Sequence, residues 1–299
     1  MSDSPPITLF NATTAAQVDE LLNRGEDIED IRGVPKKTPL ISAIKRGELE
    51  VVDCLLKHGA DPNKALPFMP SPIQIAAEQG RAAIVESLVK AGALINDSRK
   101  GEAPLFFASR QGDIDVLESL LSLGADTEVR DSSGWTALMW ACRQGTIDVV
   151  DRLLAAGCDV NAVDYGGFTA LMYAASGGYV SIIDRLVVHG ADANLLTAWS
   201  GSALMWASQY GHIEAVDRLL SLGCDADVQD SIGRTALMLA CMKENAEIVK
   251  LLLDHGADPL LCTSDGKRAV DLAASSSEIQ TLLNGLILLS FHHHHHHVP

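Results

Sequence analysis

The sequence predicts an all-α solenoid in which helix–turn–helix repeats of 33 residues stack side by side. One small residue recurs at identical 33-residue intervals, at Ala137, Ala170, Ala203, Ala236 and Ala269. The same phrase surrounds these anchors, Thr-Ala-Leu-Met-Trp-Ala at 136–141 and Ser-Ala-Leu-Met-Trp-Ala at 202–207. Pro39 and Pro72 extend the series backwards, and Pro104 follows after a step of 32 residues. A period of this length indicates a stacked array with a concave groove, and it argues against a globule built around a central cleft.

The first half of a repeat is predicted from residues 131–145. Asp131-Ser-Ser-Gly134 is typical of a turn, because Asp supplies a side-chain acceptor and Gly a permissive backbone. Thr136 is a suitable N-cap for a short helix that reaches about Gln144. Gly145 then interrupts the helix.

A second helix is predicted from Ile147 to Ala156, and Gly157 ends it as a C-terminal cap. Its apolar residues recur at helical spacing, at Val149, Val150, Leu153 and Leu154. Neither helix of the pair can bury its apolar face alone, so each repeat requires its neighbours.

These residues resemble the ankyrin repeat. The family phrase Asp-x-x-Gly-x-Thr-Pro-Leu-His-x-Ala-Ala, followed by Gly-Ala-Asp-x-Asn after the second helix, is matched almost literally by 38–40 and 55–63. The resemblance implies a degenerate N-terminal repeat at 1–37, seven repeats at 38–266 and a C-terminal cap at 267–291. Residues 292–299 contain His292–His297 and are typical of a purification tag, with a native metal-binding tract as the alternative.

Two departures from the family pattern are visible. Methionine stands where the family often has histidine, at Met139, Met172, Met205 and Met238. The turn at Thr197-Ala-Trp-Ser200 lacks the usual Asp and Gly, so we expect it to be shaped differently.

Composition restricts the classes of partner. The formal net charge of −16 disfavours nucleic acid and anionic membranes, because both attract a positive face. The six cysteines replace small residues at repeat positions and form no CxxC pair, which indicates a reducing compartment. Residues 1–11 show no secretory pattern, and no apolar stretch is long enough to span a bilayer. We therefore expect a cytoplasmic protein, with the nucleus as the alternative, and a monomer when alone.

Catalytic patterns are absent from the sequence. It contains no GxSxG, HExxH or phosphate-loop motif. The histidines outside the tail, His58, His189, His212 and His255, occupy repeat positions and are interpreted as structural. We expect no enzymatic activity, no cofactor, no metal and no small-molecule substrate.

The resemblance implies that turns and first helices form the concave side, and most of the large aromatic residues lie there between 104 and 236. The predicted partner-binding residues are Phe107, Arg110, Trp135, Trp140, Arg143, Tyr165, Phe168, Tyr173, Trp199, Trp206 and Tyr210. Exposed Trp, Tyr and Arg are the residue types that anchor interfaces. The sequence therefore predicts that a protein or peptide binds there, through apolar anchors and some acidic groups.

A packing interpretation competes for part of this set. Phe107, Trp140, Tyr173 and Trp206 recur at one repeat position, and such regular spacing is also what packing between repeats requires. Packing does not demand rings at the turn positions, which favours binding for Trp135, Tyr165, Phe168 and Trp199, and for Tyr210 at a helix end. The charge pattern of the groove is explained equally well by a solvated surface.

Two alternatives to partner binding stay open. Asn161 ends a Cys-Asp-Val-Asn phrase, and the resemblance implies that such residues are substrates of asparaginyl hydroxylases, although the same Asn is a structural turn residue in the family. The chain could also belong to a larger assembly and dock through Leu286–Phe291, for which the last helix of a cap is the simpler interpretation.

Overall fold

The structure is a computed structural model that describes residues 3–99, 101–273 and 275–295. Within these ranges the chain forms 17 α-helices, and the β pairing consists of one isolated bridge between Arg32 and Lys37. The predicted all-α class is confirmed. The helices divide between two compact units, residues 1–137 with 155–158 and residues 138–154 with 159–299.

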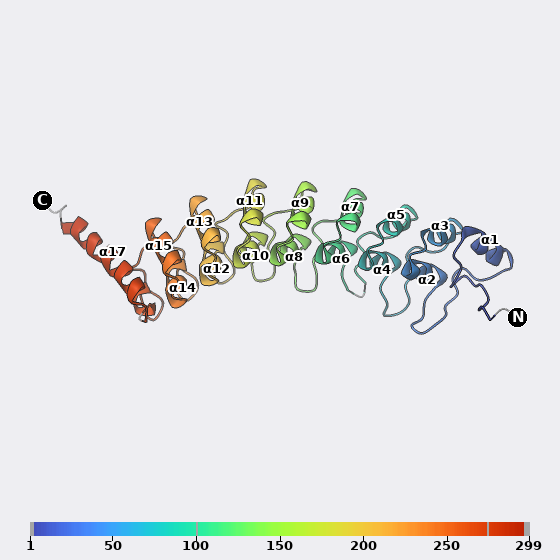
Figure 1. Ribbon diagram of the computed structural model, residues 1–299, viewed down its shortest axis with the longest axis horizontal. Coiled ribbons are helices and arrows are strands. Elements are labelled where there is room, and N and C mark those ends of the chain that lie inside the picture. The colour runs from blue at the N-terminus through green and yellow to red at the C-terminus, as the bar shows by residue number, and fades with distance from the viewer. Residues whose placement is uncertain (1–2, 100, 274, 296–299) are drawn as a thin grey trace. The chain divides into compact units, whose positions relative to one another are not determined.

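The first unit consists of one N-terminal helix and three helix pairs. Its helices are α1 (Ala15–Asn23), α2 (Pro39–Arg46), α3 (Leu49–Lys57), α4 (Pro72–Glu78), α5 (Ala82–Lys90), α6 (Pro104–Gln111) and α7 (Ile114–Ser122). First helices pack on first helices, in the order α2, α4, α6, and second helices form the parallel row α1, α3, α5, α7. Figure 1 shows the two rows of this unit, with loops extending beyond the first helices.

The second unit continues the same pattern. Its helices are α8 (Ala137–Gln144), α9 (Ile147–Ala155), α10 (Ala170–Gly177), α11 (Val180–Val188), α12 (Ala203–Gln209), α13 (Ile213–Ser221), α14 (Ala236–Met242), α15 (Ala246–Asp254), α16 (Ala269–Leu272) and α17 (Ser277–His295). First helices stack in the order α10, α12, α14, α16, and second helices in the order α11, α13, α15, α17 (Figure 1).

Five of the first helices, α2, α4, α10, α12 and α14, begin at hydroxyl caps. The side-chain oxygens of Thr169, Ser202 and Thr235 each accept a hydrogen bond from the backbone N–H three residues later. This satisfies one of the donors left free at a helix start. In the first unit Thr38 and Ser71 cap α2 and α4 in the same way, each followed by proline.

Glycine is required at the end of α10, where this first helix meets the next repeat. Gly178 has φ of 72°, and a Cβ there would lie 2.5 Å from Nδ1 of His212. The same imidazole is hydrogen-bonded through Nε2 to the carbonyl of Ser176 at 2.8 Å. One residue thus closes a helix and makes room for a side chain of the following repeat.

The core lies between the two rows of helices. Leu138, Ala141 and Cys142 on the first helix, and the predicted apolar residues of the second, are all buried. The four methionines at the family's histidine position are also buried, so a flexible apolar side chain fills the space between repeats there. Their burial explains how the repeats pack without the hydrogen bonds that histidine would have supplied.

In two of the turns between repeats, a buried aspartate carboxylate within the turn holds the backbone in shape. Oδ1 of Asp164 accepts hydrogen bonds from the N–H groups of Gly166 and Phe168, both at 2.9 Å. Asp131 makes the same two contacts in its own turn. We call each such turn a finger, and define it as the five residues from the acceptor onward, 164–168 in this case.

The expectation that the finger at 197–201 is shaped differently was wrong. Thr197 Oγ1 takes the place of the carboxylate and accepts from the N–H groups of Trp199 and Gly201, at 3.3 and 3.0 Å. Ser200 adopts φ of 60°, where the other fingers have glycine at positive φ. A hydroxyl can replace the carboxylate because the turn needs only an acceptor of the right reach.

Successive fingers of the second unit are joined through their backbones. The N–H of Ala198 donates to the carbonyl of Gly166 at 3.0 Å, and the N–H of Ser231 donates to that of Trp199 at 2.9 Å. Ser264 donates to Ile232 at 2.9 Å in the next step. Because backbone groups make this ladder, it does not depend on the side chains at the finger tips.

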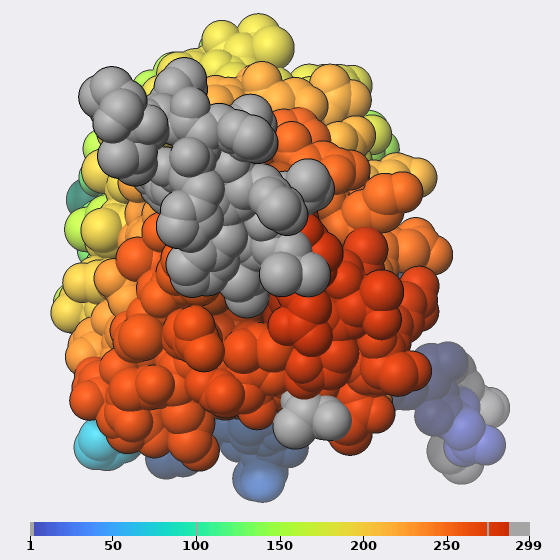
Figure 2. All heavy atoms as spheres, turned by 90° about the vertical axis from the view of Figure 1, so that its left-hand side faces the viewer, coloured from blue at the N-terminus to red at the C-terminus, as the bar shows by residue number. Residues whose placement is uncertain are grey.

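The C-terminal end consists of α16 and α17. Figure 2 views this end, where the orange residues of the last full repeat and the red residues that follow form the face. The predicted tail begins inside α17, whose backbone continues to His295, whereas residues 296–299 lie outside the described residues. Among the helices described, none combines the length and apolar character needed to cross a bilayer.

Candidate binding surface

Three of the predicted rings form one cluster in the second unit. The ring centroid of Phe168 lies 5.6 Å from that of Tyr173 on α10, and 4.9 Å from that of Trp206 on α12. All three side chains are half-buried. We call Phe168, Tyr173 and Trp206 the aromatic cluster; it lies on the first-helix face, meaning the first helices and the fingers before them.

Structural contacts hold the aromatic cluster in place. The hydroxyl of Tyr173 donates to Oδ2 of Asp164 at 2.5 Å, the carboxylate that organises the finger. A Cβ on Gly201 would lie 2.5 Å from the ring of Trp206, so this indole packs directly on the finger that precedes its own helix. These contacts favour the packing interpretation for Tyr173 and Trp206, while their rings still form part of the surface.

Trp199 is exposed beside this cluster. It occupies the tip of the finger at 197–201, and 60% of its surface is accessible to solvent. Its ring reaches back over the preceding finger, where a Cβ on Gly166 would lie 3.5 Å from it. Packing does not bury this indole, so the structure leaves it available as an anchor.

A pocket of about 220 Å³ opens between Trp199 and Trp206. We call it the Trp199 pocket; it is lined by Thr197, Trp199, Gly201, Met205, Trp206, Gln209, Asp230, Arg234 and Leu239. Met205 and Leu239 are buried and give it an apolar floor, whereas Gln209 and Arg234 are partly accessible. Such a mixture is typical of a site that takes one apolar group and orients it with a few polar contacts.

The charges of the Trp199 pocket are already paired. Nε of Arg234 lies 2.8 Å from Oδ2 of Asp230. Oδ1 of the same carboxylate accepts from the N–H groups of Ile232 and Arg234, at 3.1 and 2.8 Å. Because the carboxylate balances the guanidinium, the pocket presents little net charge to a ligand.

The other predicted residues of the second unit lie on the same face with different exposure. Tyr165, at a finger tip, and Tyr210, at the end of α12, are 79% and 57% exposed. Trp140 on α8 is half-buried, and Arg143 at the end of that helix is exposed.

Phe107, Arg110 and Trp135 belong to the first unit. The guanidinium carbon of Arg110 lies 5.6 Å from the ring centroid of Phe107, a cation–π arrangement on α6. Arg110 also forms an ion pair with Glu102, and burial raises the pKa of that carboxyl even though Arg110 opposes the shift. Trp135 is half-buried in its finger, where its backbone N–H donates to Oδ1 of Asp131.

Part of the pocket wall was not predicted from the sequence. Thr197 and Asp230 share the repeat position of Asp131 and Asp164, which predicts a turn and not a pocket wall, and Gln209 carries no aromatic or repeated signal. The available signal was the departure at Thr197–Ser200, which marks the finger that carries Trp199.

Asn161 is held by the following repeat. Its Nδ2 donates to the carbonyl of Gly190 at 3.0 Å, and its Oδ1 accepts from the N–H of Asp192 at 2.8 Å. Asn63 makes the equivalent pair of bonds to Gly92 and Leu94 in the first unit. Both ends of the amide are therefore used to join repeats.

Stacked helix pairs that are joined to the next repeat through fingers and asparagine bridges define a helical-repeat protein. A family model described as ankyrin repeats (3 copies) matches residues 67–131, 105–197 and 204–289, and a model described as ankyrin repeat matches residues 36–65. The chain belongs to the ankyrin repeat family, as its sequence predicts. Ankyrin repeats are a protein–protein interaction module, generally without catalytic activity.

Several curated proteins share part of this array. Ankyrin repeat and SOCS box protein 11 of Homo sapiens is 29% identical over 101 residues, which cover 34% of this chain and 31% of that protein. The Danio rerio protein of the same name is 36% identical over 101 residues, 34% of each chain. Alpha-latrocrustotoxin-Lt1a of Latrodectus tredecimguttatus is 33% identical over 115 residues, 38% of this chain and 8% of the toxin. The chain thus spans about a third or less of the length of these relatives.

Proposed function

We propose that the protein is a non-catalytic scaffold, adaptor or inhibitor that binds a protein or peptide through the turns and first helices of the repeats between 104 and 236. In the second unit the contact centres on the Trp199 pocket. The observation that supports this most strongly is an indole left 60% exposed at a finger tip, beside a pocket of about 220 Å³ with an apolar floor.

The partner contributes an apolar side chain to the pocket. Because Asp230 already balances Arg234, a ligand carboxylate gains little there, and an apolar group loses little by displacing water. Covering the exposed part of an indole stabilises a complex by about 2–3 kcal/mol. That magnitude makes Trp199 an interface anchor, whereas the exposed Tyr165 and Tyr210 contribute at the rim.

Selection of peptides from a displayed random library on the full chain tests this proposal. Peptides recovered on the wild-type protein are expected to bind the Trp199→Ala variant at least ten-fold more weakly. Val188→Ala is the matched control, because Val188 is also an exposed apolar residue but lies on the second helix α11. Equal binding by the Trp199→Ala variant, or a loss on Val188→Ala, contradicts the proposal.

Hydroxylation of Asn161 is a separate proposal for the same repeats. Both ends of its amide are hydrogen-bonded between repeats, so a hydroxylase would have to act on a locally opened chain. Intact-mass measurement of protein from its native host tests it, since one added oxygen per chain supports modification and an unmodified mass contradicts it.

The remaining expectations accompany the main proposal. They are a monomer when alone, a cytoplasmic or nuclear location, and no nucleic-acid, membrane or small-molecule partner. A docking role for Leu286–Phe291 also stays a proposal. The side chains that follow Leu286 in this segment lie outside the described part of the chain.

A further inference from the structure

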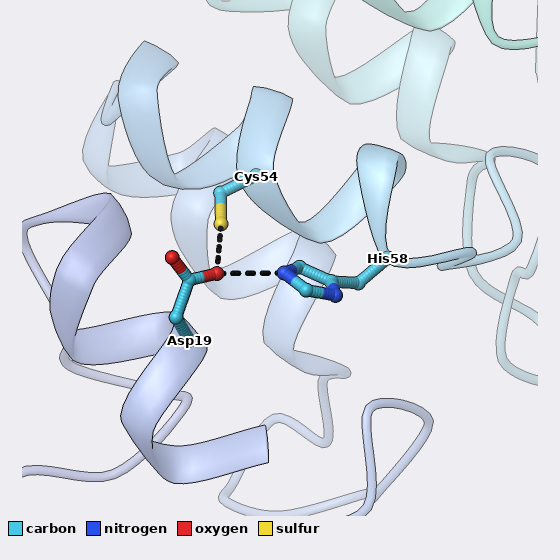
Figure 3. A group of neighbouring side chains, drawn as sticks. All are labelled: Asp19, Cys54 and His58. Atoms are coloured by element: carbon cyan, nitrogen blue, oxygen red, sulfur yellow. Dashed lines mark hydrogen bonds and ion pairs between the residues drawn. The ribbon is translucent and has the colours of Figure 1, made fainter. Parts of the chain in front are cut away.

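Three side chains capable of binding a metal ion meet where α1 packs on α3 in the first unit. Asp19 lies on α1, Cys54 on α3, and His58 follows the last residue of α3. Nε2 of His58 lies 2.6 Å from Oδ1 of Asp19, and Sγ of Cys54 lies 3.4 Å from the same oxygen. Figure 3 shows the thiol and the imidazole both directed at this carboxylate. The three ligand atoms all lie within 4.8 Å of one another.

Comparison with other repeats shows that this arrangement is particular to the N-terminal end. His189 and His255 occupy the position of His58 in later repeats, and each turns Nδ1 to a carbonyl of its own helix at 2.9 Å. His58 turns instead to the neighbouring helix. Its orientation is therefore not a general consequence of the repeat position.

Cys54 also departs from its repeat equivalents. It lies four residues before the helix cap, where the second unit has Arg185 and Arg218. Those arginines pair with a carboxylate of the preceding repeat, Asp151 at 3.1 Å and Asp184 at 3.4 Å. Between α1 and α3 the same type of contact to the preceding helix is made by a thiol and an imidazole.

The geometry does not suit a cysteine nucleophile. The Cys54 thiol and the His58 imidazole are both hydrogen-bonded to Asp19, and not to each other. The carboxylate therefore occupies the place from which an imidazole base would have to activate the thiol. Burial and the nearby carboxylate raise the pKa of Cys54 to about 11, which leaves the thiol protonated at neutral pH.

We propose that Asp19, Cys54 and His58 bind one divalent transition-metal ion of the Zn²⁺ class. A thiolate, an imidazole and a carboxylate are the ligand types that Zn²⁺ prefers, and three protein ligands leave a fourth position for water or a partner's side chain. One negative charge each from Asp19 and Cys54 balances the charge of the ion. Binding of the ion releases the proton of the Cys54 thiol to solvent.

Small side-chain movements convert the observed arrangement into a tetrahedral one. Ligand atoms around Zn²⁺ lie about 3.3–3.6 Å apart, as bond lengths of about 2.0–2.3 Å require. The Asp19–Cys54 distance of 3.4 Å already fits, whereas the Asp19–His58 distance of 2.6 Å must open by about 0.8 Å. His58 is exposed, so rotation of its side chain can supply this change without moving either helix.

The structural consequence is a link between the N-terminal helix and the first complete repeat. Asp19 comes from α1, while Cys54 and His58 both come from the α3 segment. The bound ion therefore holds α1 on α3 and stabilises the packing of these two helices.

Titration of the full chain with Co²⁺ tests the site. A bond between cobalt and a thiolate produces a charge-transfer band in the near ultraviolet, which the histidine tract at 292–297 does not produce. We expect this band to saturate at one ion per chain and to disappear when Zn²⁺ is added. Absence of the band at saturating Co²⁺ overturns the proposal.

Variants assign the ligands. Cys54→Ser is expected to abolish the band, and Asp19→Asn and His58→Gln to weaken Co²⁺ binding at least ten-fold. Two matched controls are expected to leave the band unchanged. They are Cys262→Ser, which changes an exposed thiol, and His189→Gln, which changes the equivalent histidine of a later repeat.

A band that survives Cys54→Ser, or is unaffected by both Asp19→Asn and His58→Gln, overturns the three-ligand site. Should Cys54→Ser fail to fold by circular dichroism, the exposed His58→Gln decides the outcome alone.

Discussion

Single residues determine whether a finger forms without its usual Asp and Gly. Thr197 supplies the acceptor that a carboxylate provides elsewhere, but Ser200 must adopt φ of 60°. A residue with a Cβ is disfavoured in this conformation, whereas glycine adopts it readily. The finger that presents Trp199 thus contains strain that the other fingers of this unit avoid.

Ser200→Gly is therefore expected to stabilise the protein, by about 0.5–1 kcal/mol after the greater chain entropy of glycine is included. Urea unfolding followed by circular dichroism measures the effect. Ser231→Gly is the control, because Ser231 is also a serine of a finger but is not at positive φ. An unchanged or lower stability for Ser200→Gly contradicts this account of the finger.

Glu102 makes a pH-dependent contribution to the first unit. Burial raises the pKa of its carboxyl above the usual 4.5 in the folded state, so folding favours the protonated form. Its contribution is fully present below pH 4.5 and is lost as pH rises through the higher folded value.

The unfolding free energy of the wild type, relative to that of Glu102→Gln, is expected to fall as pH rises from 4 to 7. Urea titrations of both proteins across this range measure the difference, in which the other carboxylates cancel. A difference that grows in favour of the wild type would show that the Arg110 ion pair outweighs burial.

At the scale of elements, the sequence predicts the helices closely. It places a pair at about 136–144 and 147–156, and the structure has Ala137–Gln144 and Ile147–Ala155. Caps and glycines are local signals, so one repeat contains enough information to define its own helices.

Contacts between repeats were harder to predict. The Trp199 pocket depends on Arg234 and Asp230 of the next finger, and no local pattern gives their distance from Trp199. Cys54 and His58 meet Asp19 across 35 and 39 residues, in the region where the N-terminal repeat departs from the period of 33.

Asn161 tests the importance of contacts between repeats. Asn161→Ala removes two hydrogen bonds to the following repeat and is expected to destabilise the protein by about 1–3 kcal/mol, because it leaves backbone groups unpaired. Thermal and urea unfolding measure the loss. Asn194→Ala changes the equivalent, exposed residue of the next repeat and should cost less; equal losses would contradict the bridging role.

At the scale of the whole molecule, net charge dominates the electrostatics. The chain carries a net charge of −16, whereas exposed ion pairs such as Arg185–Asp151 contribute only about 0–1 kcal/mol each. Screening of the excess negative charge should therefore outweigh the weakening of these pairs.

Raising NaCl from about 10 to 200 mM, which shortens the Debye length from about 30 Å to below 10 Å, is expected to raise the thermal unfolding midpoint. Differential scanning calorimetry measures the shift. A lower midpoint at the higher salt concentration would show that specific ion pairs control stability.

The central claim is that the first-helix face of the second unit accepts an apolar anchor beside Trp199. Hydrogen exchange of the full chain, with and without a peptide selected on it, tests this most directly. The account predicts slower exchange at the neighbouring fingers, 197–201 and 230–234, which contribute residues to the lining of the pocket. Protection confined to the second helices α11, α13 and α15 would contradict it.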